Sequence, residues 1–365
     1  MIAARSAVLA TPPAVHGGRL ALDNLDTTGA VAKHDFSVCL NAFGPAPIVT
    51  RAIVSSRVDE YPDPHNVLPR QAAAARWDRP VGEIVFAAGA AELIYAACHA
   101  YLRAADRVLI VRPAFGEYER AARLCGAHIR AIDVFEVPFP TPAIVNEVAQ
   151  VRPRLLFLAT PMNPSGRALS RADVQRIAQA CCAADCLLVL DQAYDPFTED
   201  PVGTPAVPGH SHVLHVRSLT KDHALAGVRV AFAIAPPEIA GAIERVRVPW
   251  SASSAAQAAG AAAMHDEAIA HVARTTTLLR AEANRMMAAC SVLGVSVHAS
   301  VTHFFLIGCE SARATTERLL NGAGILVRDC TSFGLPNWIR VAARRPAENN
   351  VLLAALQSER RGNQP

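Results

Sequence analysis

The sequence of 365 residues contains almost no lysine. Of its 35 lysine and arginine residues only Lys33 and Lys221 are lysines, so arginine carries nearly all of the positive charge. The formal net charge is only +3, and no stretch clusters Lys and Arg. Because a nucleic-acid groove needs such a cluster, we expect small-molecule partners and no nucleic acid.

Long apolar runs are also missing. No run reaches the roughly 20 apolar residues needed to cross a bilayer, so we expect no membrane protein. The nine cysteines, including the adjacent Cys181 and Cys182, form no CxxC pair and no metal-ligand spacing, so we expect no metal site. The chain opens without the regions of a signal peptide. These absences together predict a reduced, cytoplasmic protein.

The length predicts two domains, each able to bury its own core. From about residue 80, short apolar runs alternate with helical stretches, which is typical of a doubly wound α/β sheet. The runs are Glu83–Phe86, Arg107–Val111, Leu155–Ala159, Leu187–Leu190, Val213–Val216 and Val228–Ile234. Because ligands of such sheets bind beyond the carboxyl ends of the strands, we expect the functional residues in those loops.

A second, smaller α+β region is predicted after the helix-favouring stretch of residues 238–289. Its strand-like segments are residues 295–298, 304–307, 325–327 and 338–341, with a helical segment at 312–321. We therefore expect a large domain over residues 46–245. Residues 1–45 and 246–365 would form an N-terminal arm and a small C-terminal domain.

Lys221 lies just past the strand-like run that ends at residue 216. Schiff-base chemistry requires a fixed primary amine whose pKa is lowered by burial or by cationic neighbours. A solvated loop lysine is the alternative. Ser218, three residues before, and Arg229, eight residues after, favour the first interpretation, because a hydroxyl and a guanidinium suit a phosphate beside the lysine.

The segment Ser218-x-x-Lys221, followed by Leu-Ala-Gly-x-Arg229, resembles the cofactor lysine segment of fold-type I pyridoxal-phosphate (PLP) aminotransferases. The likeness is strongest to the group of histidinol-phosphate aminotransferases and threonine-phosphate decarboxylases; His16-Gly17-Gly18 is similar to the opening of the latter. The resemblance covers about residues 16–350. It implies a large, mainly parallel, seven-stranded sheet domain and a small α+β domain.

The resemblance also implies roles around the PLP ring. Lys221 would hold the cofactor as a Schiff base, and Asp191 would keep the pyridine nitrogen protonated. Tyr194 and Asn163 would bond the phenolic oxygen. Phe115 would stack on the ring, although an ordinary core phenylalanine fits the local sequence equally well. Asp191 taken alone could instead be a helix N-cap.

For the cofactor phosphate, Gly89, Ala90 and Ala91 precede or begin a predicted helix, whose terminal N–H groups favour an anion. Ser218 and Arg229 would complete this phosphate site. Tyr61 matches the family's tyrosine that reaches the phosphate across a subunit interface. The resemblance thus implies a homodimer with shared active sites.

On the substrate side, the resemblance gives Arg340 the α-carboxylate and Arg328 a second anionic group. A surface ion pair is the alternative for Arg328. Asn41 and Gly44 lie in a segment similar to the family's substrate-side arm.

Several residues depart from the family pattern. Ala90 and Ala91 replace the hydroxyl and the acid of the family's Gly-Ser-Asp-Glu phosphate loop, Gln192 stands for the usual Glu, His303 for Asn, and His223 follows the lysine. Either histidine could serve as an acid or base, or simply be packed in the core. These departures leave the substrate open.

The function implied is a PLP-dependent aminotransferase of amino-acid metabolism. It would move an amino group from an amino acid or amino phosphate to a 2-oxo acid acceptor. Two alternatives remain: a PLP-dependent decarboxylase of a phosphorylated amino acid, and a non-catalytic descendant suggested by Gln192 and the altered phosphate loop.

Overall fold

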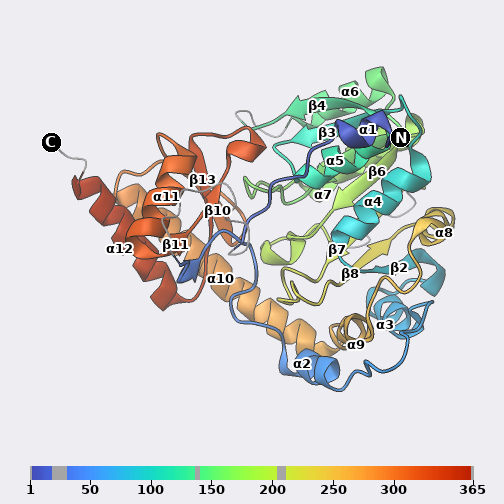
Figure 1. The fold of residues 1–365 in the computed structure, drawn as a ribbon, viewed down its shortest axis with the longest axis horizontal. Helices are drawn as coiled ribbons and strands as arrows, with labels where there is room; N and C mark the ends of the chain where they lie inside the picture. The colour runs from blue at the N-terminus through green and yellow to red at the C-terminus, as the bar shows by residue number, and fades with distance from the viewer. Residues whose placement is uncertain (1, 19–30, 136–139, 204–210, 363–365) are drawn as a thin grey trace.

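The large unit of the computed structural model contains a seven-stranded sheet in the order β2-β8-β7-β6-β5-β3-β4 (Figure 1). The structure describes residues 2–18, 31–135, 140–203 and 211–362. The strands are β2 (Ile84–Ala87), β3 (Arg107–Arg112), β4 (His128–Asp133), β5 (Leu155–Ala159), β6 (Leu187–Asp191), β7 (Val213–Ser218) and β8 (Ala231–Ile234). β8 alone runs opposite in direction to the other six strands. This architecture confirms the predicted fold class.

The central strands read as continuous apolar runs because helices cover both faces of the sheet. All five residues of β6 are buried. One face packs against α4 (Ala90–Tyr101), α5 (Gly116–Leu124) and α8 (Pro237–Val246). The other face packs against α6 (Thr141–Val151) and α7 (Arg171–Ala183).

The sequence prediction missed β4 and began β8 too early. No residue of β4 is fully buried, since it is an edge strand, so it lacks the apolar run that marks its neighbours. The segment before β8 is not strand because Arg229 takes a left-handed conformation with φ of 64°. The strand therefore begins at residue 231, three positions after the predicted start.

The predicted helical stretch of residues 238–289 is three separate helices: α8, α9 (Ser254–Ala262) and α10 (Asp266–Val292). Ser253 starts α9 by accepting the Ala256 N–H at 3.1 Å. This helix packs against α2 (Pro47–Val54) and α3 (Val67–Trp77), beside the large sheet. The domain boundary at residues 245–246 stays a prediction, since part of the chain beyond it packs with the large unit.

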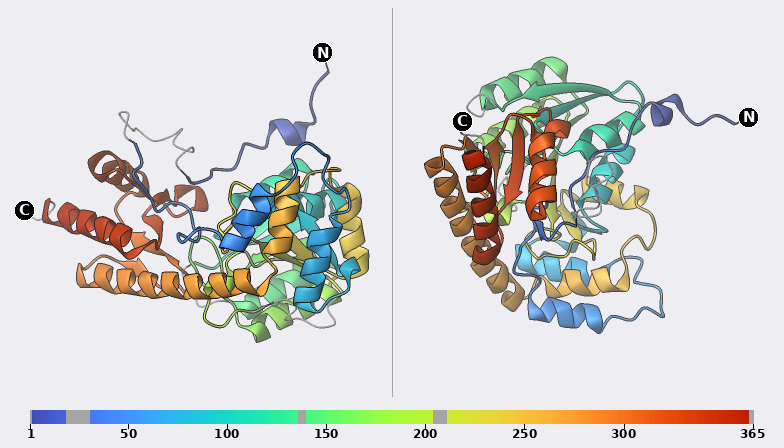
Figure 2. Two further views of the ribbon diagram at one scale, coloured as in Figure 1. Left: turned by 90° about the horizontal axis from the view of Figure 1, so that it is seen from below. Right: turned by 60° about the vertical axis from the view of Figure 1, so that its left-hand side comes forward.

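The small unit has a four-stranded antiparallel sheet in the order β12-β13-β10-β9. These strands are β9 (Val297–His298), β10 (Phe304–Gly308), β12 (Arg328–Asp329) and β13 (Trp338–Ala342). α10, α11 (Ala312–Ala323) and α12 (Pro346–Gly362) cover it, with Met286, Phe305 and Val341 in the shared core. α10 spans both units (Figure 2).

The N-terminal arm touches both units. α1 (Ser6–Leu9) contacts α5 of the large unit, whereas β1 (His34–Asp35) pairs in parallel with β11 (Ile325–Leu326) of the small unit. Three short 3₁₀ helices complete the elements: η1 (Val81–Glu83), η2 (Asp195–Phe197) and η3 (Thr331–Phe333). Within the described ranges, no helix is both long and apolar enough to span a membrane.

Candidate active site

The predicted lysine and aspartate meet at the carboxyl ends of β6 and β7. β6 ends at Asp191, which pairs with Val216 of β7, and Lys221 follows β7 by three residues. Both line a cavity of about 130 Å³. Its walls are Ala90, Ala91, Phe115, Tyr118, Ala159, Pro161, Asn163, Asp191, Ala193, Tyr194, Ser218, Thr220, Lys221 and Arg229. Most of the predicted cofactor residues are thus brought together.

Asp191 is held at the end of its strand by two hydrogen bonds. The Tyr118 hydroxyl donates to Oδ2 at 2.5 Å, and the Ala193 N–H donates to Oδ1 at 2.9 Å. Burial raises the pKa of the carboxyl, while these bonds and the Lys221 charge oppose the shift. Tyr118, which sequence reasoning missed, is itself fixed by stacking on Phe157 with centroids 5.0 Å apart. Its only sequence signal is its place one helical turn after Phe115.

The Lys221 amine lies in a setting that favours its neutral form. Burial lowers its pKa, and the cationic side chains of Arg340 and Arg229 lower it further, against the opposing effects of Cys39 and Asp191. Its Nζ lies 6.0 Å from the centroid of the Tyr194 ring. A partly desolvated amine of this kind can act as a nucleophile and as a base.

An anion cradle lies at the start of α4. Gly89 has φ of 93°, and a Cβ there would come within 2.5 Å of Nη2 of Arg229, so the guanidinium lies directly over the glycine. Ala90 and Ala91 open α4 and face the cavity beside the buried Ser218. First-turn N–H groups, a hydroxyl and a guanidinium are a donor set that fits a phosphate.

A second cavity of about 340 Å³ adjoins the first and shares Lys221, Arg229 and Asn163 with it. Arg340 of β13 and Arg328 of β12 line this second cavity. Arg340 donates from Nη1 to Oδ1 of Asn163, and from Nη2 to the Ser37 carbonyl at 2.5 Å. Its position fits the predicted carboxylate-binding role.

Arg328 is 7% exposed, which argues against the alternative of a surface ion pair. It donates to the carbonyl oxygens of Val15 at 2.9 Å and His16 at 2.8 Å, and to the Ser332 hydroxyl at 2.8 Å. Among the described residues, these neutral oxygens are its hydrogen-bond partners. Both arginines therefore keep a positive charge that an anionic ligand can neutralise.

His16 and Glu117 form a pair at the rim of the second cavity that sequence reasoning did not identify. The His16 Nε2 lies 2.8 Å from Oε1 of Glu117, whose Oε2 accepts the Tyr95 hydroxyl at 2.6 Å. The His16 ring lies 5.8 Å from that of Phe115. Cys39 also lines this cavity and was missed; burial raises the pKa of its thiol. No motif links these residues in sequence.

Asn41 lies beneath the lysine rather than in either cavity wall. Its N–H donates to the Lys221 carbonyl at 2.9 Å, and its Nδ2 donates to the Asp222 carbonyl at 2.9 Å and to Oγ1 of Thr275 at 2.7 Å. The Gly44 carbonyl likewise bonds Nε2 of His271 at 3.0 Å. Through these contacts both residues attach the N-terminal arm to other parts of the chain: Asn41 to the lysine segment and α10, and Gly44 to α10. Their predicted substrate contacts stay predictions.

Of the departures from the family pattern, Ala90 and Ala91 line the first cavity, whereas Gln192, His223 and His303 lie outside both cavity walls. Gln192 is buried and bonds the Gly203 carbonyl at 2.8 Å and the His215 Nδ1 at 3.0 Å. The ring of His303 is fully buried and stacks on Phe197 with centroids 3.8 Å apart. Burial lowers the pKa of His303 to about 3, so this ring is neutral at physiological pH.

His223 is buried too, with its Nε2 3.9 Å from Oδ2 of Asp222. Burial lowers its pKa against the opposing charge of Asp222, which favours the neutral form of this packed ring.

Tyr61 is the predicted cofactor residue that the structure does not bring to the cavity. Its side chain is 85% exposed and lies against Trp250, with ring centroids 5.2 Å apart. Within one chain it therefore contributes nothing to the walls of the site.

The family model described as aminotransferase class I and II matches residues 39–356. The chain is 32% identical over 324 residues to the histidinol-phosphate aminotransferase of Symbiobacterium thermophilum, which covers 87% of this chain and 88% of that protein. It is also 32% identical over 342 residues to the threonine-phosphate decarboxylase of Salmonella typhimurium, covering 91% and 92%.

Among solved structures, the histidinol-phosphate aminotransferase of Sinorhizobium meliloti in complex with pyridoxal-5'-phosphate matches with a TM-score of 0.88. The identity is 24%, and the match covers 98% of both chains. The likeness therefore extends over both units of the fold.

Proposed function

This chain belongs to the class I and II aminotransferases and is a pyridoxal-phosphate-dependent enzyme, and we propose that Lys221 holds the cofactor while Arg328 and Arg340 hold an anionic amino substrate. One observation carries the proposal. Lys221 lies in the wall shared by the two cavities, between the buried carboxylate of Asp191 and two arginines bonded to neutral oxygens.

When bound, pyridoxal phosphate supplies a ring that accepts the negative charge formed at the substrate Cα. Asp191 would face its ring nitrogen, where a carboxylate favours the protonated form. The N–H groups of Ala90 and Ala91, with Ser218 and Arg229, would hold its phosphate. Phe115 and the pair Tyr194 and Asn163 line the same cavity, as their predicted roles require.

Lys221 then has two tasks. Its amine would hold the cofactor aldehyde carbon before the substrate arrives. Once the substrate amine takes that place, the freed Nζ would take the proton from the substrate Cα and return it on the cofactor side. A lowered amine pKa suits this work, because the base must be unprotonated near neutral pH.

The substrate class follows from charge. Arg340 offers a planar fork to a carboxylate, and Arg328 provides a second positive centre in the same cavity. We infer a donor with two anionic groups or a phosphate, in line with the histidinol phosphate named by the relatives. The acceptor would be a 2-oxo acid.

The homodimer is part of this proposal. Tyr61 and Trp250 lie in segments that also carry the exposed apolar side chains Val58 and Val248, so a second copy could cover them. Tyr61 would then reach the neighbouring cofactor phosphate. We also place the enzyme in the cytoplasm, where all nine cysteines could stay as the free thiols of the structure.

The test is a substrate panel read by the absorbance of the bound cofactor. We expect histidinol phosphate or glutamate to bleach the yellow colour, and a 2-oxo acid to restore it. If no amino compound bleaches it in a protein that retains the cofactor, the proposed substrate class is wrong.

One observation favours a second reaction, decarboxylation of a phosphorylated amino acid. The carbonyl of His16, which begins the His-Gly-Gly segment similar to that of threonine-phosphate decarboxylases, is bonded to Arg328, and such a decarboxylase is among the relatives. Release of CO2 from threonine phosphate without any 2-oxo acid would establish this reaction in place of transamination.

A further inference from the structure

A carboxylate stands at the start of α4, next to the cradle proposed for the cofactor phosphate. Glu92 is the third residue of α4, and its Oε2 accepts the Ala88 N–H at 2.5 Å. This bond fixes the backbone just before Gly89, one residue earlier than in a capping box, where the glutamate bonds the N-cap N–H. It also brings a negative charge close to N–H groups that would hold another anion.

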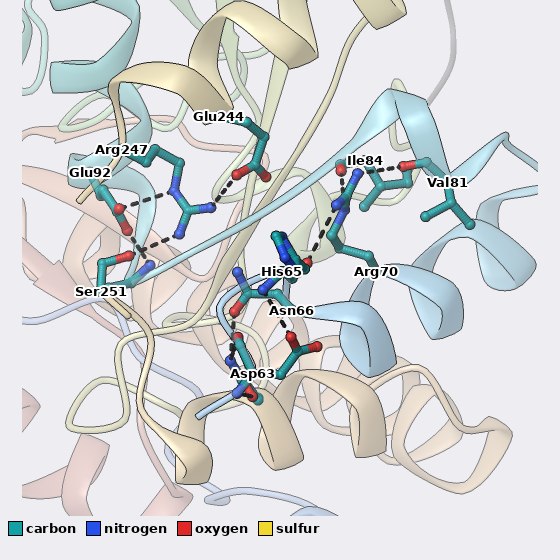
Figure 3. A network of polar contacts seen from close by, with 12 residues as sticks. Asp63, His65, Asn66, Arg70, Val81, Ile84, Glu92, Glu244, Arg247 and Ser251 are labelled. Carbon is teal, nitrogen blue, oxygen red and sulfur yellow. Dashed lines mark hydrogen bonds and ion pairs between the residues drawn. The ribbon is translucent and has the colours of Figure 1, made fainter. Parts of the chain in front are cut away.

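Arg247 compensates this charge from a distant part of the chain. Its Nε donates to Oε1 of Glu92 at 3.0 Å, its Nη1 to Oε2 of Glu244 at 3.0 Å, and its Nη2 to the Ser251 hydroxyl at 2.9 Å (Figure 3). The Arg247 side chain is 4% exposed. The Glu92 side chain is 19% exposed, so the pair is partly buried and less screened than a surface pair, and its charge balance matters to neighbouring anions.

Neither Glu92 nor Arg247 lines the cofactor cavity. We propose that Arg247 is a positioning residue for the cofactor phosphate: it neutralises Glu92, which lets this carboxylate fix the start of α4 without repelling the phosphate. The inference rests on the proposed placement of the phosphate at Ala90 and Ala91. It explains how a first-turn glutamate and a dianionic ligand share one helix terminus.

Arg70 provides a matched comparison in the same region (Figure 3). It also makes three hydrogen bonds, but all go to backbone carbonyls: Ile84 at 2.8 Å, Val81 at 3.1 Å and His65 at 3.4 Å. Removing Arg70 therefore costs packing and hydrogen bonds and leaves no carboxylate unpaired. Removing Arg247 leaves two carboxylates, Glu92 and Glu244, without their cationic partner.

The experiment titrates the cofactor-free full chain with pyridoxal phosphate and with pyridoxal, which lacks the phosphate, and follows the absorbance. We expect Arg247→Met to raise the Kd for pyridoxal phosphate about tenfold and to leave the Kd for pyridoxal unchanged. The double variant Glu92→Gln/Arg247→Met should recover most of the loss, since the carboxylate is gone. Arg70→Met should lower the Tm without changing the ratio of the two Kd values.

Two results would overturn the inference: an equal loss of affinity for both compounds in Arg247→Met, or no recovery in the double variant. If Arg247→Met does not fold, Glu92→Gln alone decides. Its amide oxygen can still accept the Ala88 N–H, so we expect tighter competition by inorganic phosphate, and weaker competition would contradict the inference. A wild-type chain without preference for pyridoxal phosphate over pyridoxal would instead refute the placement of the phosphate.

Discussion

The proposed cofactor half and the proposed substrate half of the site are built in different ways. Asp191, Ser218 and Lys221 lie at or just beyond the ends of two neighbouring strands of one sheet. Arg328 and Arg340 come from the small unit and meet the N-terminal arm, whose carbonyl oxygens bind both guanidinium groups. Strand register positions residues in both halves, since Arg328 and Arg340 are cross-strand partners on β12 and β13. The second half depends in addition on packing of the small unit against the distant N-terminal arm.

The two halves also differ in charge. The cofactor half places the Asp191 carboxylate in the same cavity as the Lys221 amine, so positive and negative groups are both present. The second cavity also has a carboxylate, Glu117, but this group is bonded to His16 and Tyr95. The two arginines of the substrate half bond to neutral oxygens. The first half is suited to a ligand with a cationic ring and the second to anions. Substitutions in the first half should therefore lower kcat, whereas substitutions in the second should raise KM.

The largest effect is expected from Lys221→Ala. Without the amine, the proposed covalent link and the proton carrier are both lost, and kcat should fall by at least about 10⁴-fold. Single-turnover absorbance with saturating substrate measures this. Lys33→Ala, which removes the other lysine at an exposed position, is the control and should keep its activity. Comparable loss in both variants would refute the proposed role of Lys221.

Arg340→Lys should act mainly on the substrate half, since among the described residues its one hydrogen bond to the wall of the cofactor cavity is that to Asn163. A lysine cannot present the guanidinium fork, so we expect KM for the 2-oxo acid to rise about 100-fold with the cofactor still bound. Arg328→Lys should raise KM only for substrates that carry a second anionic group. Steady-state kinetics with pyruvate, which has one carboxylate, and 2-oxoglutarate, which has two, separates the two cases. If both variants raise the KM of both acids equally, Arg340 and Arg328 do not bind different anionic groups.

Tyr118→Phe should have a smaller effect on the cofactor half than Lys221→Ala. The variant keeps the ring stacked on Phe157 and removes only the hydroxyl that donates to Asp191. Loss of a hydrogen bond to a charged group should lower kcat about tenfold, with KM nearly unchanged. Tyr101→Phe on α4 is the control. A change in KM alone would place Tyr118 in the substrate half.

The smallest effect at neutral pH is expected from His303, which belongs to neither cavity wall. Its pKa of about 3 in the folded chain lies below the value of about 6.5 in an unfolded chain. Between about pH 3 and about pH 6.5 the unfolded state therefore binds one more proton than the folded state. The free energy of unfolding should fall as pH drops through the window, by up to about 1.4 kcal/mol per pH unit from this group.

His303→Asn should remove that contribution and flatten the decline, while activity at neutral pH changes little. Urea unfolding of the cofactor-free protein at a series of pH values measures the slope. His128→Asn, at an exposed position, is the control. An unchanged slope in His303→Asn would show that the ring is not held neutral by burial.

Most residues predicted for the cofactor meet in one cavity because they lie just beyond strand ends, and apolar runs reveal strands; their roles stay predictions. The sequence prediction missed Tyr118 and Arg247 because each acts on a residue more than 70 positions away, Asp191 and Glu92 respectively. No local pattern reports such a contact. Asn41 shows the same limit, since the motif identified the residue while the structure places it beneath the lysine.

The central claim is that Lys221 holds the cofactor, and chemical trapping tests it most directly. The holoprotein is reduced with borohydride, digested, and its peptides are analysed by mass spectrometry. We predict one pyridoxyl-phosphate adduct, on the peptide that contains Lys221. An adduct on Lys33, or a cofactor that leaves the reduced protein unmodified, would contradict the account.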